Sequence, residues 1–126
     1  LDGVTHLLSS VPPGPDGDPV LNLHAADIAA RARQIVWAGY LSTTGVYGDR
    51  GGDWVDERAA LDPATERGAR RVAAEAAWCA LHQLHGLPVH LFRLAGLYPA
   101  DTLPHFRSGN GTKFLCGIEE SLESAH

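Results

Sequence analysis

Three short apolar runs alternate with two longer segments of helical periodicity along this chain. The apolar runs lie at residues 3–11, 35–44 and 87–98, and each leads into small polar, glycine or proline residues. Nearly continuous apolar runs are typical of parallel strands that are covered on both faces. The alternation predicts an α/β fold: a partial Rossmann-type three-layer fold, with three parallel strands joined by right-handed crossover helices.

Both helical segments carry start signals. An Asp-Pro pair at residues 18–19 supplies an N-cap and a first-turn proline, and the spacing of apolar residues after it predicts a helix to about Arg33. A second Asp-Pro pair at residues 62–63 precedes an alanine-rich stripe, which predicts a helix over residues 63–85 that Gly86 ends. This stripe either covers the sheet or forms a face for self-association.

The alternation of strands and helices stops at residue 99. We therefore expect residues 1–99 to form one unit and residues 100–126 to form a divergent tail. The tail is predicted to be a loop, with a short terminal helix as an option, around Phe114, Leu115, Ile118 and Leu122. Three parallel strands alone would leave unpaired sheet edges, so we expect a homo-oligomer, a partner or pairing with a missing half.

Composition narrows the class of protein. With 126 residues, of which 44% are hydrophobic and 20% are charged, the chain fits one globular domain. The formal net charge of -5, with basic residues clustered only on the second predicted helix, argues against a nucleic-acid partner. No apolar run is long enough to span a bilayer, so no membrane partner is expected.

The two cysteines, Cys79 and Cys116, lie far apart and have no metal-ligand spacing. A buried reduced thiol is expected for Cys79, and this fits a cytoplasmic location. The first residues lack the pattern of a secretory signal. Because the chain also lacks an initiator Met, we expect that it is processed or is a piece of a longer protein.

The predicted strands end in small, hydroxyl or turn residues. In open α/β sheets the ligand crevice lies beyond the carboxyl ends of the strands, so these ends are expected to line one site. The residues concerned are Ser10, Val11, Pro12, Ser42, Thr43, Leu97, Tyr98 and Pro99.

The segments "LSTTGVYGD", "RGARRVAAE" and "PVHLFRLAGLYP" resemble, in order and spacing, the second half of the Rossmann domain of the extended short-chain dehydrogenase/reductases. This is the group of NAD-dependent epimerases and dehydratases. "YLSTTGVYGDRGGDWVDE" is most similar to an atypical branch described as nucleoside-diphosphate-sugar epimerase-like. The resemblance covers roughly residues 1–99 and implies NAD or NADP as cofactor, a nucleotide-sugar-like substrate and an oxidoreductase or epimerase activity.

The resemblance also implies roles for single residues. Thr43 matches the Ser or Thr that hydrogen-bonds the substrate, which makes it the candidate catalytic residue. Arg71 falls where the Lys of the YxxxK pattern holds the nicotinamide ribose, and Arg67 falls where the catalytic Tyr belongs. Ser10, Val11, Pro12 and Ser42, with Leu97, Tyr98 and Pro99, would flank the cofactor.

The chain departs from the family at two places that matter for activity. An arginine cannot give up a proton near neutral pH, so Arg67 cannot replace the phenol as acid/base, although Arg71 could still donate hydrogen bonds to a ribose. The glycine-rich GxxGxxG turn that receives the pyrophosphate does not occur. We therefore expect weak or no turnover by this chain, and the alternative is a non-catalytic scaffold or cofactor-sensing module that acts through its helical face.

Other candidate sites are weaker. His82 and His85 have a spacing that could bind a metal but no third ligand, and His6 and His90 are expected to be core or edge residues. The acidic residues that follow the second strand are expected to cap or solvate a loop. Tyr40 and Tyr47 are the nearest phenols, but packing is the expected role of both. A serine hydrolase would need GxSxG, which "YLSTTG" lacks.

Overall fold

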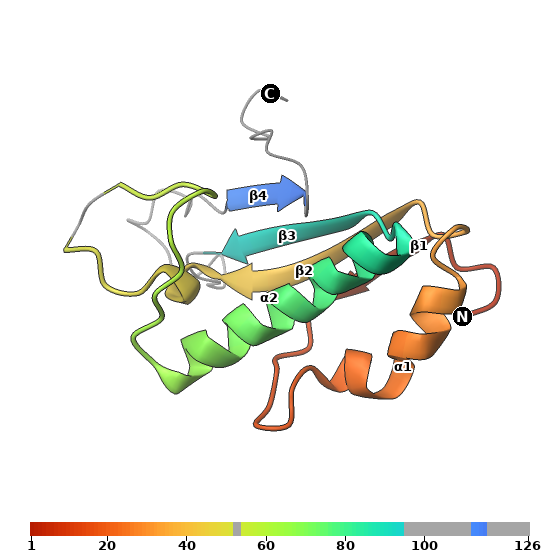
Figure 1. Ribbon diagram of the computed structural model, residues 1–126, viewed down its shortest axis with the longest axis horizontal. Coiled ribbons are helices and arrows are strands. Elements are labelled where there is room, and N and C mark those ends of the chain that lie inside the picture. Colours follow the sequence, from red (N-terminus) through yellow and green to blue (C-terminus); the bar gives the residue numbers. More distant parts are fainter. Residues whose placement is uncertain (52–53, 95–111, 116–126) are drawn as a thin grey trace, which may run out of the picture.

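The computed structural model describes residues 1–51, 54–94 and 112–115. In this part of the chain two helices cover one face of a four-stranded sheet (Figure 1). The elements are, in order, β1 His6–Ser9, α1 Pro19–Ala30, β2 Trp37–Thr43, the short 3-10 helix η1 Thr44–Tyr47, α2 Glu66–His85, β3 Val89–Leu94 and β4 Thr112–Leu115.

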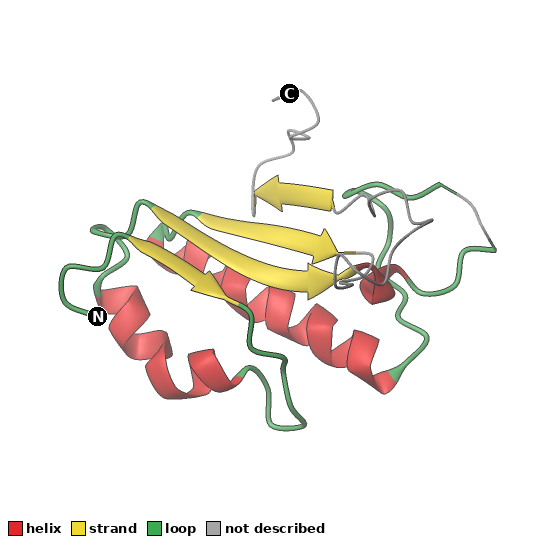
Figure 2. Ribbon diagram, turned by 180° about the vertical axis from the view of Figure 1, so that it is seen from behind, coloured by secondary structure: helices red, strands yellow, loops and turns green. Residues whose placement is uncertain are grey.

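The sheet has the strand order β1-β2-β3-β4, and its first three strands are parallel. The register places Leu7 beside Ala38 and Tyr40 beside Leu91. This confirms the α/β class with three parallel strands. Because both crossovers step in the same direction across the sheet, α1 and α2 lie on the same face (Figures 1 and 2). The described residues therefore supply two of the three layers of a Rossmann-type fold.

The edge of β3 is paired with β4, which runs antiparallel to it and places His90 beside Leu115. The option of a short helix around Phe114 and Leu115 is therefore wrong for these two residues. Pairing with the open edge of β3 decides their conformation, and local apolar spacing could not reveal that partner. Ile118 and Leu122 lie outside the described residues.

Side chains fix where the helices begin. Asp18 caps α1 as predicted: its Oδ1 accepts from the backbone N–H groups of Val20 at 2.8 Å and Leu21 at 3.3 Å. The second helix begins at Glu66 rather than at residue 63, because Thr65 is its N-cap and accepts from the Gly68 N–H at 3.0 Å.

The helix ends differ in how well the sequence predicts them. The first helix ends at Ala30, a few residues before the predicted Arg33. The second ends as predicted at Gly86, whose φ of 74° lies in the left-handed region that glycine tolerates best.

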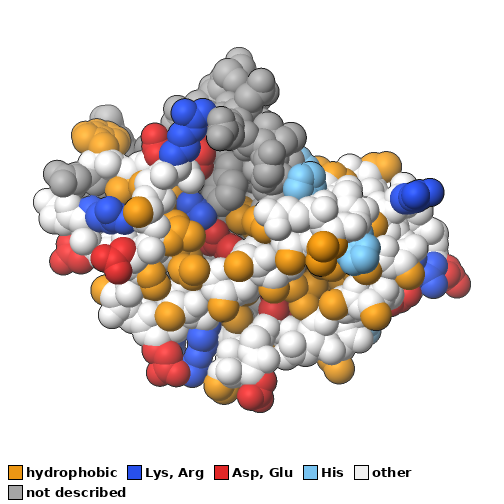
Figure 3. All heavy atoms as spheres, in the orientation of Figure 1, with side chains coloured by type: hydrophobic (Ala, Val, Ile, Leu, Met, Phe, Trp, Pro, Cys, Tyr) orange, Lys and Arg blue, Asp and Glu red, His pale blue; other side chains and the backbone are white. Residues whose placement is uncertain are grey.

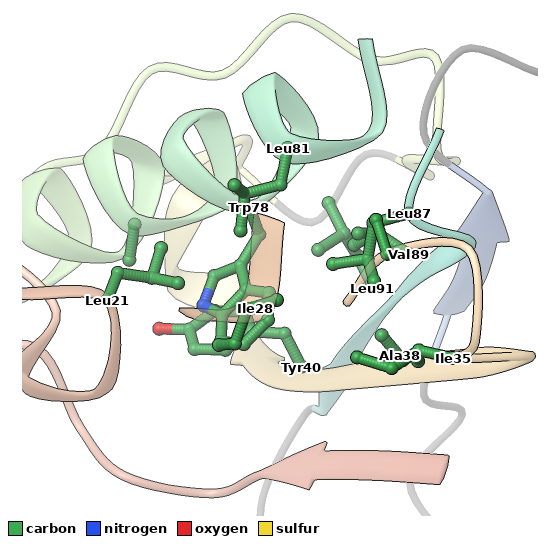
Figure 4. Packing of buried hydrophobic residues seen from close by; sticks show 12 residues of the cluster. Leu21, Ile28, Ile35, Ala38, Tyr40, Trp78, Leu81, Leu87, Val89 and Leu91 are labelled. Carbon is green, nitrogen blue, oxygen red and sulfur yellow. The ribbon is translucent and has the colours of Figure 1, made fainter. Parts of the chain in front are cut away.

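The core lies between the two helices and the sheet (Figure 4). Trp78 of α2 is fully buried and stacks on Tyr40 of β2 with ring centroids 5.8 Å apart. Its indole N–H donates to Oδ2 of Asp18 at 2.9 Å. Asp18 therefore both caps α1 and joins the loop after β1 to α2.

The alanine stripe of α2 faces mainly away from the sheet. The sheet-facing side of the helix is instead formed by Ala74, Trp78 and Leu81, which belong to the core. The exposed residues of the stripe are Ala69, Ala73, Ala76, Ala77 and Leu84. Covering the sheet is therefore not the role of most of this stripe.

Cys79 is disulfide-bonded, which corrects the prediction of a reduced thiol. The prediction rested on the burial habits of cysteine, and sequence spacing alone cannot show whether two distant cysteines meet. Cys116 lies outside the described residues. The argument for a cytoplasmic location from a reduced thiol therefore no longer holds. Neither helix in the described part of the chain has the length and apolar character needed to cross a bilayer.

Candidate functional site

The carboxyl ends of β1, β2 and β3 point to one edge of the sheet, and α2 begins at this same edge (Figure 2). The parallel pairing of these strands requires this arrangement. It is the edge at which open α/β sheets bind ligands. Charged side chains lie mainly toward the two ends of the helical face (Figure 3).

A cavity of about 370 Å³ lies at this edge, between the loop after β1 and the first turns of α2. Its lining residues are Pro12, Pro13, Arg67, Arg70 and Arg71. The fold thus brings Pro12 and Arg71, two predicted cofactor contacts from distant parts of the sequence, into one cavity. We call this the arginine cavity.

Arg71 is held by its Nη1 atom. This nitrogen donates to the Tyr40 hydroxyl at 3.1 Å and to the Leu41 carbonyl at 2.8 Å. The guanidinium carbon lies 5.8 Å from the centre of the Tyr40 ring, within the range of a cation–π contact. Because a guanidinium has five N–H donors, Nε and Nη2 stay without a hydrogen-bond partner among the described residues.

Arg67 and Arg70 are held less firmly. Arg70 pairs with Glu66 one turn earlier, with 2.6 Å between Nη2 and Oε1. Arg67 is exposed and makes no hydrogen bond or ion pair within residues 1–51, 54–94 and 112–115. It lies in the first turn of α2, where the helix dipole disfavours a cation. Helix stability therefore does not explain an arginine at this position.

The two hydroxyls at the end of β2 have different environments. Thr43 is half-buried and caps η1, since its Oγ1 accepts from the Gly45 N–H at 3.2 Å. Ser42 is buried and donates to Oε2 of Glu75 at 2.5 Å. This bond directs the Ser42 hydroxyl to the interior, so its contact with a cofactor stays a prediction.

Ser42 belongs to a buried polar network beneath the strand ends. Arg93 and Glu75, each 3% exposed, form an ion pair with 2.6 Å between Nη2 and Oε1. The Nη1 atom of Arg93 also donates to the Tyr47 hydroxyl at 2.9 Å. Burial lowers the pKa of Arg93, but the bonds and charge of Glu75 outweigh this, so its pKa is raised overall. The network therefore keeps both charges in the interior.

The two phenols near the site have the packing role that the sequence predicted. Tyr40 is fully buried against Trp78, and Tyr47 is 2% exposed. Burial raises the pKa of Tyr40 above its usual 10.0, and the Arg71 guanidinium offsets part of this rise. A buried phenol that binds its proton more tightly is a poor acid/base group at neutral pH.

Gly68 allows α2 to approach η1 closely, a role that the sequence did not reveal. A Cβ atom at this position would lie 2.9 Å from the Gly45 carbonyl oxygen and 2.9 Å from the Pro63 Cβ. A glycine between the arginines of an otherwise regular helix was the available signal. This close approach fixes the first turns of α2, and with them the arginines, against the end of β2.

The other predicted contacts fall into two groups. Ser10 and Val11 directly follow β1 and are exposed. Leu97, Tyr98 and Pro99 lie outside the described residues, so their contacts stay predictions. The part that the sequence missed is the lining by Pro13 and Arg70, although the grouping of three arginines on one helix was visible.

Two histidines make contacts with neighbouring elements of the structure. A ring nitrogen of His82 lies 2.9 Å from the Leu87 carbonyl oxygen. The His90 ring stacks on Trp37 with centroids 5.4 Å apart. Among the described residues no group of three His, Cys, Asp or Glu side chains could hold a metal ion.

Comparisons with known proteins support the fold. A conserved protein from Silicibacter pomeroyi, described as functionally unknown, is 57% identical over 78% of this chain, with a TM-score of 0.74. UDP-glucuronic acid 4-epimerase from Bacillus cereus, solved in complex with NAD, is 20% identical over 68% of the chain, with a TM-score of 0.54. No protein-family model and no curated protein matches the chain.

The matched region is only part of each of these proteins. The chain spans 34% of the Silicibacter protein and 29% of the epimerase. The likeness to the epimerase at this identity is one of fold. The described part of the chain therefore has a Rossmann-type architecture that matches one portion of these larger proteins.

Proposed function

We propose that this chain forms one side of the NAD(P) site of an oxidoreductase or epimerase of the short-chain dehydrogenase/reductase type. The observation that carries the proposal is the arginine cavity, which lies beyond the carboxyl end of β1 and is lined by Pro12 and Arg71. The resemblance to the short-chain dehydrogenase/reductases gives Arg71 the position that holds the nicotinamide ribose, and it places Pro12 at the flank of the cofactor. The fold is that of an epimerase solved with NAD.

The residues present fit one part of such a cofactor. Arg71 keeps Nε and Nη2 open, and these donors suit ribose hydroxyls. Ser10 and Val11 would flank the cofactor, and Thr43 would contact the substrate. When bound, the nicotinamide would supply hydride transfer. The pyrophosphate needs the glycine-rich turn that this sequence lacks, so the remaining contacts would come from a missing half or a partner.

The acid/base group of the family has no counterpart in the described site. Arg67 stands in its sequence position, and the phenols of Tyr40 and Tyr47 are buried. We therefore propose that the chain binds cofactor and substrate but turns over weakly or not at all by itself. A nucleotide-sugar-like substrate and a cytoplasmic location remain parts of this proposal.

Self-association would use the outer face of α2. Its exposed alanines and Leu84, which is 75% exposed, form an apolar strip away from the sheet. The same strip favours the second candidate function, a non-catalytic scaffold that acts through its helical face. Sedimentation of the chain and of a Leu84→Glu variant tests this: a dimer that the variant loses supports the role of the strip.

Thermal melts of the purified chain, with and without millimolar NADH or NADPH, test cofactor binding. A ligand at 100 times its dissociation constant adds about 2.7 kcal/mol to the folded state, which raises Tm by several degrees. An increase with one nucleotide, reduced in an Arg71→Gln variant, supports the proposal and identifies the cofactor. A cooperative melt that neither nucleotide changes would contradict cofactor binding and would favour the non-catalytic scaffold.

A further inference from the structure

We propose that the arginine cavity binds an oxyanion, a carboxylate or phosphate of the substrate, through Arg67 and Arg70. This inference deepens the proposed function, on which it rests for the adjacent cofactor. It adds to that function a negatively charged group of the substrate that binds next to the proposed nicotinamide position.

The arginine cavity is more positively charged than the rest of the chain. Three guanidinium groups line the cavity, whereas the chain as a whole has a formal net charge of -5. Among the described residues, the acid that pairs with one of these arginines is Glu66, which contacts Arg70 and whose side chain is 79% exposed. An exposed ion pair of this kind is weak, so an incoming anion could share or replace Glu66. The cavity therefore keeps a positive excess.

The arginines of the cavity have N–H donors that could bind an anion. Arg67 has no hydrogen-bond or ion-pair partner within the part of the chain that the structure describes, and Arg71 is bound through Nη1 alone. A guanidinium with two free donors binds a carboxylate or phosphate in a bidentate manner. The opposite wall is formed by Pro12 and Pro13, which have no N–H to offer. The anion would therefore be recognised by the arginines.

Arg67 lies at the positive end of helix α2. Its place in the first turn of α2 is unfavourable for a cation, and an anion in the cavity would relieve this because it adds negative charge at the positive end of the helix. Because Gly68 has no side chain, this turn can pack closely against Gly45 of η1. The arginines thus stand on a rigid element.

Isothermal titration of the chain with inorganic phosphate and with malonate, at constant ionic strength, tests the inference. Arg67→Gln and Arg70→Gln should each weaken binding about 10-fold, since each removes a charge-assisted hydrogen bond. Arg67→Lys keeps the charge but loses bidentate geometry, so its affinity for the anion should lie between those of the wild-type chain and Arg67→Gln. The matched control is Arg33→Gln, which removes an exposed arginine after α1 at the opposite edge of the sheet and should leave binding unchanged.

A second titration, with NADH or NADPH already present, identifies the source of the anion. If phosphate or malonate binds together with the nucleotide, the anion belongs to a separate substrate, as proposed. Competition by the nucleotide would overturn the inference, because the cavity would then hold a phosphate of the cofactor. Equal binding by the wild-type chain and Arg67→Gln would also overturn it. Arg67-dependent binding of phosphate without any binding of NADH would instead overturn the cofactor proposal alone.

Discussion

Two groups of charges at helix α2 differ in almost every physical respect. Glu75 of α2 and Arg93 of β3 are nearly inaccessible to solvent and are joined by an ion pair. Arg67 and Arg70, nearer the start of α2, line a cavity, and within the described residues only Arg70 of the two has an ion-pair partner. The charges of the first group are satisfied by other buried side chains, whereas those of the second group line a cavity.

This difference separates structural from functional charge. A charge withdrawn from water is tolerated only when other groups satisfy it, and the network of Ser42, Glu75, Arg93 and Tyr47 does so within the fold. Exposed arginines have no such need, because water solvates them. Changes in the buried group should therefore affect stability, and changes in the open group should affect binding.

The largest expected effect comes from breaking the buried pair. Glu75→Gln keeps the shape of the side chain but removes the negative charge beside Arg93, which should lower the free energy of unfolding by about 3–5 kcal/mol. Urea denaturation measures this. The matched control is Glu66→Gln on the same helix, where loss of the exposed pair should cost about 0.5 kcal/mol or less. Similar losses for the two variants would contradict the comparison.

A smaller loss is expected at Asp18, which joins α1 to α2. Asp18→Ala removes the N-cap of α1, worth about 1 kcal/mol, and leaves the buried Trp78 indole N–H without its acceptor, at a further 1–3 kcal/mol, or roughly 2–4 kcal/mol together. Asp16→Ala in the same loop is the control and should be nearly neutral. Urea denaturation that shows no difference between the variants would refute this role.

Tyr40 holds Arg71 of the arginine cavity, and the stability that it contributes should respond to pH. Tyr40→Phe loses the bond to Arg71, about 1 kcal/mol near neutral pH. Because the folded pKa of Tyr40 is raised above 10.0, its contribution is complete below pH 10 and is lost as pH rises through the folded value. Unfolding measured between pH 8 and 11 should therefore show a steeper alkaline loss for the wild-type chain. Parallel curves would contradict burial of the ionising phenol.

The smallest effect on stability is expected in the open group. Arg67→Gln should change the free energy of unfolding by less than about 0.5 kcal/mol, because Arg67 is exposed and makes no hydrogen bond or ion pair within the described residues. Arg70→Gln should cost about 0.5 kcal/mol through its exposed ion pair. Thermal melts without ligand measure both. A loss of several kcal/mol at Arg67 would give it a structural role.

The sequence by itself determined the parallel core of the fold. Continuous apolar runs, the cap at Asp18 and the stop at Gly86 are local signals, and local signals suffice where nearby residues satisfy the backbone. Together with the small, hydroxyl and turn residues at the ends of the strands, they indicated the edge of the sheet at which a ligand would bind. The cofactor type came from the resemblance.

Only the tertiary structure decided how distant residues meet. Strand β4 pairs with the edge of β3, Cys79 is disulfide-bonded, and the Ser42 hydroxyl donates to Glu75. Each outcome depends on a partner far away in the sequence, which spacing within a segment cannot identify. The cavity between Pro12 and Arg71 exists for the same reason: parallel strands bring the loop after β1 and the start of α2 to one edge.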